Sequence, residues 1–562
     1  MKKNLLLLLV FAAVAVCGNA RERTLAEKQA LARQFVHAPE RMKKAQAKSH
    51  AEWSVLFDNG VLTVMGCDNT GFAIVVNDDQ LGTVAGYSDA AYDETNEGLK
   101  WFLNNVSSSL SDNRLSTINR KAAVPPSEKY KPSVDHLLTS TWNQNSPYND
   151  LCPKDTKGAG YPSGCVATAL SQIMYFHKYP ETGQGSKQYS FKPAEGVGEL
   201  LSANFGETTY DWAHMLDNYV SGNYTEEQGN AVATIMLHCG VAVEMNYTPT
   251  GSGAYSSEAR NGLVSFFKYH QNAGLLYRTY YSLEEWMDII YNELNCNRPI
   301  YYAGADANRG GHAFVLDGYD SNGFVHINWG WGASGGNGFF DITLLNPSGY
   351  EFSQGQDMII GIDKPDVQDI VYESHIVSDN ALSVSRFGAM LNVSPGTSLW
   401  NLCGYKWSGQ LGVILKNAEH TYVLNSVTAK DVANRYNTLS SLTPSDAVLG
   451  GMLKLPTDIA DGEYRLFIGS MDERDTDWRL VRRRNNVVNN YKVTISDGKL
   501  TSLEQDTDDT WPNEMTTGIQ AVQAKSKSLN QAIYDLNGRY VGTDLNALQK
   551  GIYIVRGKKV VK

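Results

Sequence analysis

The sequence predicts an α+β protein of several domains, with β-strands prevailing in its C-terminal third. Its 562 residues exceed what one hydrophobic core usually spans, so the chain should divide into domains. Helix-like and strand-like periodicities both occur before residue 364, whereas strand patterns separated by Gly, Asp and Asn turns follow Pro365. A hydrophobic content of 42% and a charged content of 19% indicate folded globular domains.

Charge and cysteine usage exclude several classes of function. The formal net charge of −11 argues against nucleic acid as a partner. The seven cysteines are scattered, with no C-x-x-C pair and no His/Cys cluster at zinc-ligand spacing. We therefore expect neither a metal site nor a cofactor.

The N-terminus has the pattern of a signal peptide over residues 1–20. Met1-Lys2-Lys3 precedes an apolar run over 5–16, and the small residues Gly18 and Ala20 follow it. The apolar run is shorter than the roughly 20 residues that a membrane-spanning helix needs. We expect cleavage after Ala20, and hence export.

A small α+β unit is predicted between residue 21 and about 120. Thr24 and Glu27 form the pattern of a capping box at the start of a helix that runs to Phe35. Strand patterns follow at 53–57, 61–65, 72–76 and 83–87, and a helical pattern covers 90–110. Pro125 and Pro126 then interrupt the polar segment 122–131, which we expect to be an exposed linker and a target of proteolysis.

The C-terminal third is predicted to form a β-sandwich followed by a short separate tail. Strand patterns lie at 410–415, 421–427, 464–468 and 490–495, and Cys403 is expected in their core. An acidic stretch over 504–514 separates them from a tail that begins near Gly518.

Cys165 is the first candidate for catalysis. It follows Ser163 and Gly164 at a turn that leads into a strong helical pattern, and Ser163 is expected to cap that helix. A thiol in the first turn of a helix faces unpaired N–H groups, which lower its pKa. A small buried core cysteine remains the alternative.

His312 is the candidate general base. Glycines 310 and 311 precede it at the mouth of an apolar strand, and it lies 147 residues after Cys165. This separation agrees with the roughly 130–150 residues between a papain-type cysteine and its downstream partners. His326 is the weaker candidate, because it lacks the glycine-framed setting.

Three further residues could complete the site. Asn328 could accept a hydrogen bond from the His312 ring, and Trp329 could shield that bond from water. The side-chain amide of Gln144, together with the backbone N–H of Cys165, could form an oxyanion hole. Gln144 could equally be a surface residue on a turn.

These motifs resemble the streptopain family of bacterial cysteine proteases, which includes interpain. The resemblance covers about residues 21–364 and rests on segments 142–149, 164–169, 241–254, 310–315 and 326–332. It implies a papain-like fold, a Cys165–His312 pair, an oxyanion hole with Gln144, and support of the histidine by Asn328 and Trp329. It also implies substrate binding by the backbone at Gly253 and Gly311, and an apolar preference two residues before the cut.

The resemblance further implies that the N-terminal unit is an inhibitory prodomain. The tail resembles a type IX secretion sorting domain, which implies that the type IX machinery is a partner and that the protein is secreted or attached to the outer-membrane surface. The expected domains are a signal peptide (1–20), a prodomain (21–124), a protease domain (125–364), a β-sandwich (365–505), a linker (506–517) and a sorting domain (518–562). Substrates would be proteins or peptides.

Two rival interpretations compete with this hypothesis. Residues 332–336 match the G-x-S-x-G pattern of serine hydrolases, but a strand pattern follows them where that motif requires a helix. A surface adhesin with an inert protease-like domain is the other rival, and the complete set of Cys165, His312, Asn328 and Gln144 argues against it.

Overall fold

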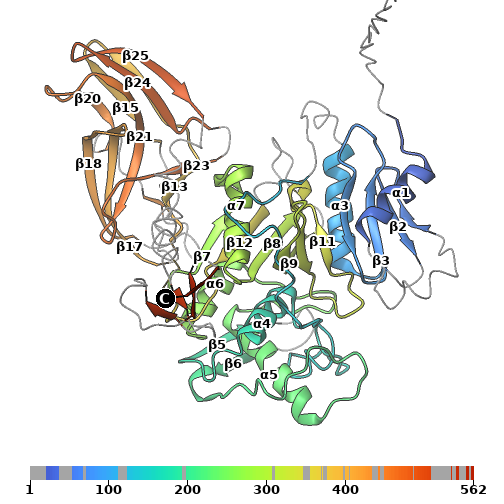
Figure 1. Ribbon diagram of the computed structural model, residues 1–562. Coiled ribbons are helices and arrows are strands. Elements are labelled where there is room, and N and C mark those ends of the chain that lie inside the picture. Colours follow the sequence, from blue (N-terminus) through green and yellow to red (C-terminus); the bar gives the residue numbers. More distant parts are fainter. Residues whose placement is uncertain are drawn as a thin grey trace, which may run out of the picture.

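The computed structural model shows a mixed α+β molecule with several sheets (Figure 1). It describes residues 21–36, 53–67, 71–111, 123–192, 198–306, 310–345, 355–368, 370, 376–396, 399–403, 405–432, 441–442, 449–484, 487–507 and four short strands between 533 and 561. The predicted signal peptide and most of the predicted linker 506–517 lie outside these residues. Among the helices so described, none is both long and apolar enough to cross a membrane.

One ten-stranded sheet runs through the N-terminal and central parts of the chain, in the order β1-β2-β3-β4-β11-β10-β9-β8-β12-β7. Its strands are β1 (Ser54–Asp58), β2 (Leu62–Cys67), β3 (Gly71–Val76), β4 (Val84–Ser88), β7 (Gly274–Tyr277), β8 (Ile300–Asp306), β9 (Gly310–Tyr319), β10 (Val325–Asn328), β11 (Gly338–Phe340) and β12 (Gln356–Ile360). The two parts join where Tyr87 pairs with Phe339 and Gly86 with Phe340. The N-terminal unit therefore extends the central sheet and does not form a sheet of its own.

Two helices cover the N-terminal strands. Helix α1 (Leu25–Phe35) begins with the predicted capping box of Thr24 and Glu27. Helix α3 (Glu97–Ser111) begins seven residues later than position 90, where its pattern was expected to start. Its buried face, which includes Leu99 and Phe102, packs into a core shared with Trp329 and Phe340. The N-terminal unit is thus held to the central unit by a common core as well as by the sheet.

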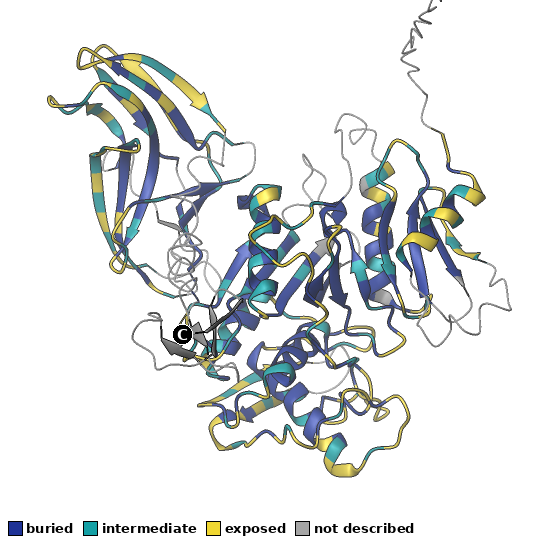
Figure 2. Cartoon of the chain, in the orientation of Figure 1, coloured by how far each residue is buried: buried dark blue, intermediate teal, exposed yellow. Residues whose placement is uncertain are grey.

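Helices on both faces of the central sheet enclose two cores (Figure 2). Helices α4 (Cys165–His177), α5 (Glu226–Ala242) and α6 (Ser256–Ser265) lie on one face, and α3 and α7 (Leu283–Asn295) contribute to the core on the other. A hairpin of β5 (Ser186–Phe191) and β6 (Glu199–Asn204) and the short helices η2 (Phe205–Glu207), η3 (Arg278–Tyr280) and η4 (Ile342–Leu345) complete this part.

The C-terminal strands form sheets that pack around one large core and a small second cluster of apolar side chains. The six-stranded sheet comprises β17 (Trp407–Lys416), β18 (Thr421–Val432), β21 (Gly462–Asp472), β22 (Arg479–Leu480), β24 (Asn490–Ser496) and β25 (Lys499–Asp506). The smaller sheets comprise β14 (Ser383–Phe387), β15 (Met390–Ser394) and β20 (Gly451–Lys454), and β13 (Ile376–Ser378), β16 (Leu399–Asn401), β19 (Ser441–Leu442) and β23 (Arg482–Arg483). Cys403 is buried in the large core, as expected.

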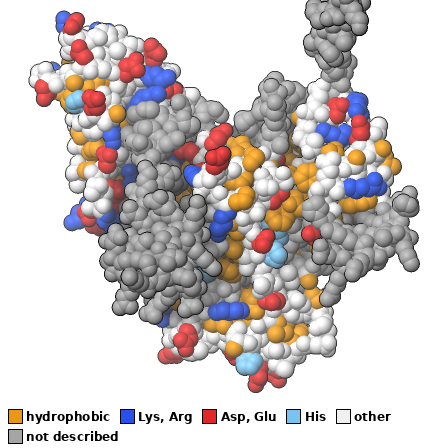
Figure 3. Space-filling view, viewed as in Figure 1, with side chains coloured by type: hydrophobic (Ala, Val, Ile, Leu, Met, Phe, Trp, Pro, Cys, Tyr) orange, Lys and Arg blue, Asp and Glu red, His pale blue; other side chains and the backbone are white. Residues whose placement is uncertain are grey.

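This C-terminal unit contacts the central one. Arg482 pairs with Glu285 at 3.1 Å, and the Tyr280 hydroxyl donates to Asp379 at 2.7 Å. Figure 3 shows Lys, Arg, Asp and Glu side chains interspersed over the C-terminal unit, whereas apolar side chains gather on the central one. The tail beyond it contains four strands, β26 (Ile533–Tyr534), β27 (Tyr540–Gly542), β28 (Ile552–Val555) and β29 (Lys558–Val561).

The segment expected to be an exposed linker is only partly exposed. Pro125 is exposed, but Ala123 is buried, and the backbone carbonyl of Val124 accepts a hydrogen bond from Tyr291. Lys129 forms an ion pair with Asp288 of α7 at 2.6 Å. The segment is therefore held on the central unit by specific contacts that the proline-rich sequence did not indicate.

Candidate active site

Cys165 is the first residue of α4, as predicted, but its cap differs from the prediction. Gly164 occupies the N-cap position with φ of 94°, and Ser163 does not cap the helix. A Cβ atom on Gly164 would lie 2.6 Å from Met245 Sδ and 3.0 Å from the Ser252 carbonyl oxygen. The close packing and the positive φ both require glycine here. They bring the segment at 245–252 against the start of α4.

The Cys165 thiol is surrounded by backbone donors. The N–H groups of Ala313, Val166 and Cys165 itself hydrogen-bond to the sulfur and lower the pKa of the thiol, but burial raises it more. The expectation of a lowered pKa is therefore wrong for this state of the protein. The helix terminus supplies donors, yet the surrounding apolar core disfavours the thiolate.

His312 lies on β9 beside Ala313, and its ring is held by two tryptophans. Its Nε2 lies 3.0 Å from the Trp329 carbonyl oxygen and 3.3 Å from Trp331 Nε1. Because Nε2 can donate to the carbonyl only when it carries a proton, it cannot then accept from the Trp331 indole. We assign the shorter contact as the hydrogen bond, with the Trp331 ring stacked on the imidazole at a centroid distance of 5.9 Å.

His312 and Cys165 come to the same point of the sheet through the residue that follows the histidine. Successive residues of a strand point to opposite faces, so the His312 and Ala313 side chains face different sides of the sheet. The backbone N–H of Ala313 is directed at the Cys165 thiol. Cys165 thus lies beside the strand that carries His312.

Asn328 does not orient His312, contrary to the prediction. Its Nδ2 donates to the Ser140 carbonyl at 2.8 Å, and its Oδ1 accepts from the Gly330 N–H at 3.1 Å. Its amide also lies 3.2 Å from the amide of Gln172 on α4. Asn328 thus links the end of β10 to α4, and the acceptor for His312 is instead the backbone carbonyl of Trp329.

Trp329 is buried and packs beside the histidine, as predicted. Its ring lies 6.4 Å from the His312 ring at an interplanar angle of 23°. It also contacts Phe102 of α3 and Phe340 of β11. The indole therefore shields the imidazole and connects it to the N-terminal unit.

Gln144, Gly253 and Gly311 lie around the thiol and the histidine. The Gln144 side chain is buried, and its backbone carbonyl accepts from the Ser163 N–H at 3.0 Å, two residues before Cys165. Gly253 is exposed and pairs with Asn246 beside the start of α4. Gly311 is exposed next to His312. All three predicted residues thus border the same site.

The start of α3 lies directly on His312. A Cβ atom on Gly98 would lie 3.1 Å from His312 Nε2 and 3.0 Å from the Trp329 ring. Trp101, one turn later, packs on Gly304, which pairs with His312 across β8 and β9. The N-terminal unit therefore covers the face of the sheet on which the His312 ring lies.

His326 and the glycine-rich segment 332–336, the two alternatives to the predicted site, lie in surroundings that differ from those of a catalytic group. His326 Nδ1 lies 2.6 Å from the buried carboxylate of Asp317, and its ring stacks on His136. The glycine-rich segment 332–336 lies between strands β10 and β11, as its sequence context indicated. Neither position has the geometry of the corresponding catalytic group.

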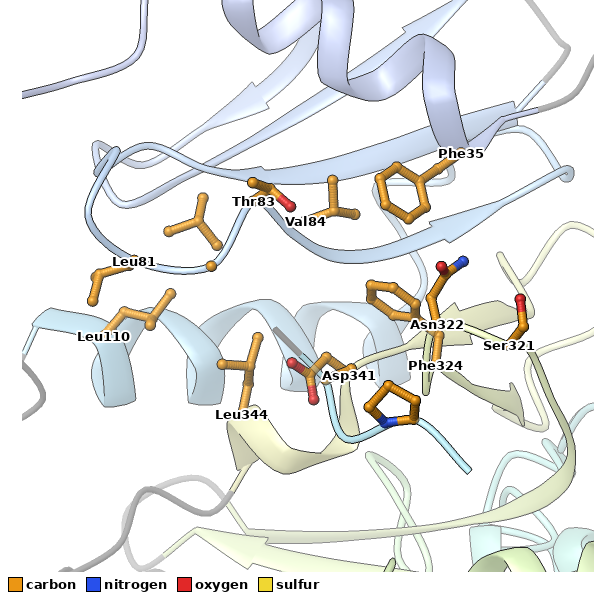
Figure 4. Close-up of a pocket in the computed structure, with 14 residues that line it drawn as sticks. Phe35, Leu81, Thr83, Val84, Leu110, Ser321, Asn322, Phe324, Asp341 and Leu344 are labelled. Carbon is orange, nitrogen blue, oxygen red and sulfur yellow. The ribbon is translucent and has the colours of Figure 1, made fainter. Parts of the chain in front are cut away.

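An apolar cavity of about 280 Å³ lies between the N-terminal and central units (Figure 4). Phe35, Leu81 and Leu110 line it from one side, and Phe324 and Leu344 from the other. It includes none of the predicted site residues. Within the described residues, no cluster of three or more His, Cys, Asp or Glu side chains could hold a metal.

Sequence reasoning missed three groups that form the site. These are the N–H of Ala313 at the thiol, the Trp331 ring on His312, and the Gln172 amide that holds Asn328. Ala313 and Trp331 lie inside the segments that carry the family resemblance, so the sequence indicated their positions but not their roles. Gln172 lies seven residues into α4, and only the packing of α4 on the sheet reveals its contact.

Comparisons with known proteins agree with this arrangement. Residues 142–340 match the Peptidase C10 family. Streptopain of Streptococcus pyogenes serotype M28 is 34% identical over 296 residues, which make up 50% of this chain and 73% of streptopain. The thiol protease/hemagglutinin PrtT of Porphyromonas gingivalis is 33% identical over 350 residues, 57% of this chain but only 40% of PrtT.

A solved structure shows the same similarity. A fragment of prointerpain A from Prevotella intermedia, carrying a cysteine-to-alanine mutation, superposes with a TM-score of 0.51 and 42% identity. The match covers 56% of this chain and 99% of the fragment. On the similarity to streptopain over most of its length and on the matched domain, the chain belongs to the Peptidase C10, or streptopain, family of cysteine proteases.

Proposed function

We propose that the chain is a cysteine endopeptidase in which Cys165 is the nucleophile and His312 the general base. The observation that supports this most is the Cys165 thiol at the start of α4, with three backbone N–H groups directed at it beside the strand of His312. These N–H groups alone do not stabilise the thiolate enough to offset its burial. A charged imidazole next to the sulfur would supply the missing stabilisation.

The proposed reaction proceeds through a thioester. The Cys165 sulfur attacks the peptide carbonyl carbon, and the oxyanion accepts hydrogen bonds from the Cys165 N–H and the Gln144 amide. His312 gives its proton to the leaving amine, then takes one from the water that hydrolyses the thioester. The Trp329 carbonyl positions the ring, and the backbone at Gly253 and Gly311 holds the extended substrate.

The experiment compares the wild-type protein with the Cys165→Ala variant on a denatured protein substrate. Iodoacetamide should abolish proteolysis by the wild type, and a chelator should leave it unchanged, because the reaction needs a free thiol and no metal. Residual proteolysis by Cys165→Ala at the wild-type rate would refute the assignment.

We further propose that the full-length chain is a latent zymogen with residues 21–124 as its inhibitory prodomain. The packing of Gly98 on the His312 ring supports this. A tethered inhibitor has a high effective concentration, so cleavage in the segment 119–134 would release it. Purified wild-type precursor should shorten with a rise in activity, and Cys165→Ala precursor should remain full length until active enzyme is added.

Export is the last part of the proposal. Residues 1–20 would direct the chain across the inner membrane, and residues 518–562 would direct it through the type IX machinery to the cell surface or the medium. Removing residues 518–562 should leave proteolysis intact and retain the protein in the periplasm. Normal surface delivery of this shortened protein would refute the sorting role.

A further inference from the structure

Asp357 of β12 lies in a row of residues that begins at the Cys165 thiol. Asp357 pairs with Ala303 of β8, and Ala303 pairs with Ala313 of β9. Residues directly opposite in antiparallel strands point to the same face, so the three side chains share one side of the sheet. Since the Ala313 N–H bonds to the thiol, Asp357 stands two strands away, about 10 Å at the usual strand spacing.

This row, Ala313, Ala303 and Asp357, lies at the border between the core and solvent. Ala313 is buried and Ala303 and Asp357 are partly exposed, whereas the next row along the same strands, Val315, Tyr301 and Ile359, is completely buried. The two alanines fill little space above the sheet. The row therefore offers little side-chain bulk between the thiol and the Asp357 carboxyl.

Other elements border the row on the side away from the thiol. Tyr277 of β7 pairs with Asp357 and is partly exposed. Ser256, the first residue of α6, contacts the Tyr301 hydroxyl at 3.2 Å and the Asp357 carboxyl. The segment that leads into α6 also lies against the start of α4 through Ser252. Tyr277 and Ser256 thus close the row beyond Asp357.

Among the residues that the structure describes, the Asp357 carboxyl has no cationic partner. Its Oδ1 is buried without a hydrogen-bond partner, and no Lys or Arg among the described residues pairs with it. Burial raises the pKa of this carboxyl to about 7, and the hydrogen bond from Ser256 lowers it only partly. A buried acceptor without a partner is unfavourable, and a cationic ligand would satisfy it.

We propose that Asp357 closes the subsite for the second residue before the scissile bond and selects lysine or arginine there. This inference rests on the proposed protease function. In an extended substrate, side chains alternate, so the residue that faces the sheet is next to the one whose carbonyl lies at Cys165. A stem of three or four methylene groups fits over two alanines, and its charged end meets the carboxylate. The selectivity differs from the apolar preference that the family resemblance implies.

The experiment measures kcat/KM of the mature, self-processed enzyme on peptides that differ only at this second position, with Arg, Lys, Leu or Val. The wild type should favour Arg and Lys over Leu. Asp357→Asn should lower kcat/KM for the Arg peptide about tenfold or more and leave the Leu peptide within about twofold, because only the charge pair is lost. Asp357→Leu should reverse the preference in favour of Leu, a gain that misfolded protein cannot produce.

Glu258→Gln is the matched control. Glu258 lies on α6 two residues after Ser256, but it faces Lys187 at 3.8 Å. This variant should keep the wild-type preference. If the wild type cleaves the peptides without favouring Arg or Lys, or if Asp357→Asn keeps the preference, the subsite is wrong although the protease assignment stands. If the wild type cleaves none of the peptides or proteins, both proposals fail.

Discussion

Asn328 connects two elements of the site without touching the reacting groups. Its amide bonds to Ser140, Gly330 and Gln172, all of them away from the His312 ring. A buried amide in such a network contributes to stability, because its removal leaves the partners unsatisfied.

We therefore predict that Asn328→Ala lowers stability more than it impairs catalysis. Unpairing two or three buried groups should decrease the free energy of unfolding by about 2–3 kcal/mol. kcat at a temperature where the variant is folded should stay within about threefold of the wild type, with an unchanged pH profile. A loss of kcat by several orders of magnitude, with normal stability, would show that Asn328 orients the histidine after all.

At the scale of elements, α3 packs closely on His312. A Cβ atom on Gly98 would lie 3.0–3.1 Å from the His312 and Trp329 side chains, so these side chains would have to shift to accept a methyl group. We predict that Gly98→Ala weakens the docking of α3 and speeds self-processing of the precursor about fivefold or more, since overpacking of this kind typically costs about 1–3 kcal/mol. The rate of shortening on a gel measures this effect.

Gly82→Ala serves as the control for that experiment. A Cβ atom at Gly82 would meet no atom within 4 Å, although the residue lies in the same N-terminal unit. The Gly82→Ala precursor should therefore cleave itself at the wild-type rate. Equal rates for both variants would show that the close contact of α3 with His312 does not maintain latency.

The half-buried His177 and the buried His238 make α4 and α5 sensitive to acid. Burial lowers the pKa of His177 to about 4, helped by the charge of Lys364, and burial lowers the pKa of His238 to about 4. In the unfolded chain both should titrate near 6.5. Between about pH 6.5 and 4 the unfolded chain then binds protons that the folded one does not, so stability falls as the pH falls.

We predict that the urea midpoint of the Cys165→Ala protein decreases from pH 7 to pH 4.5, and that an added His238→Gln substitution makes this decrease smaller. Glutamine cannot take up the proton, and it can still bond to the Tyr210 hydroxyl that now contacts His238. Above about pH 6.5 these histidines are uncharged in both the folded and the unfolded chain, so they no longer make the stability depend on pH. An equally steep decrease in the His238→Gln protein would contradict the assignment.

At the scale of the whole molecule, the C-terminal unit is held to the central unit by buried charges. The Arg482 and Glu285 side chains are 8% and 10% exposed, and the other Glu285 oxygen caps α7 through the Ser282 N–H. We predict that Arg482→Ala lowers the thermal unfolding temperature of the Cys165→Ala protein clearly, because it leaves a buried carboxylate unpaired, at a cost of about 3–5 kcal/mol.

Arg484→Ala is the comparison. Arg484 pairs with Asp379 at 3.0 Å, but its side chain is 34% exposed, and such pairs contribute at most about 1 kcal/mol. Its unfolding temperature should stay close to that of the parent. If Arg482→Ala were equally mild, the two units would be held together by apolar contacts such as those of Val377 and Leu402.

The sequence by itself determined the N-terminal elements and indicated the candidate catalytic residues. The alternation of apolar residues predicted the bounds of all four N-terminal strands to within two residues. The capping box predicted the start of α1. Both signals depend only on residues that are close together along the chain. The glycines that precede Cys165 and His312 in the sequence are local signals of the same kind. The family resemblance on these motifs was confirmed by the matched domain and by streptopain.

Only the tertiary structure decided which groups meet. The joining of β4 to β11, the packing of Gly98 on His312 and the row from Ala313 to Asp357 each involve partners from different strands or helices. Periodicity carries no information on such pairs. The pKa of Cys165 shows the same limit, because the helix start that lowers it is visible in sequence, whereas the burial that raises it comes from residues far along the chain.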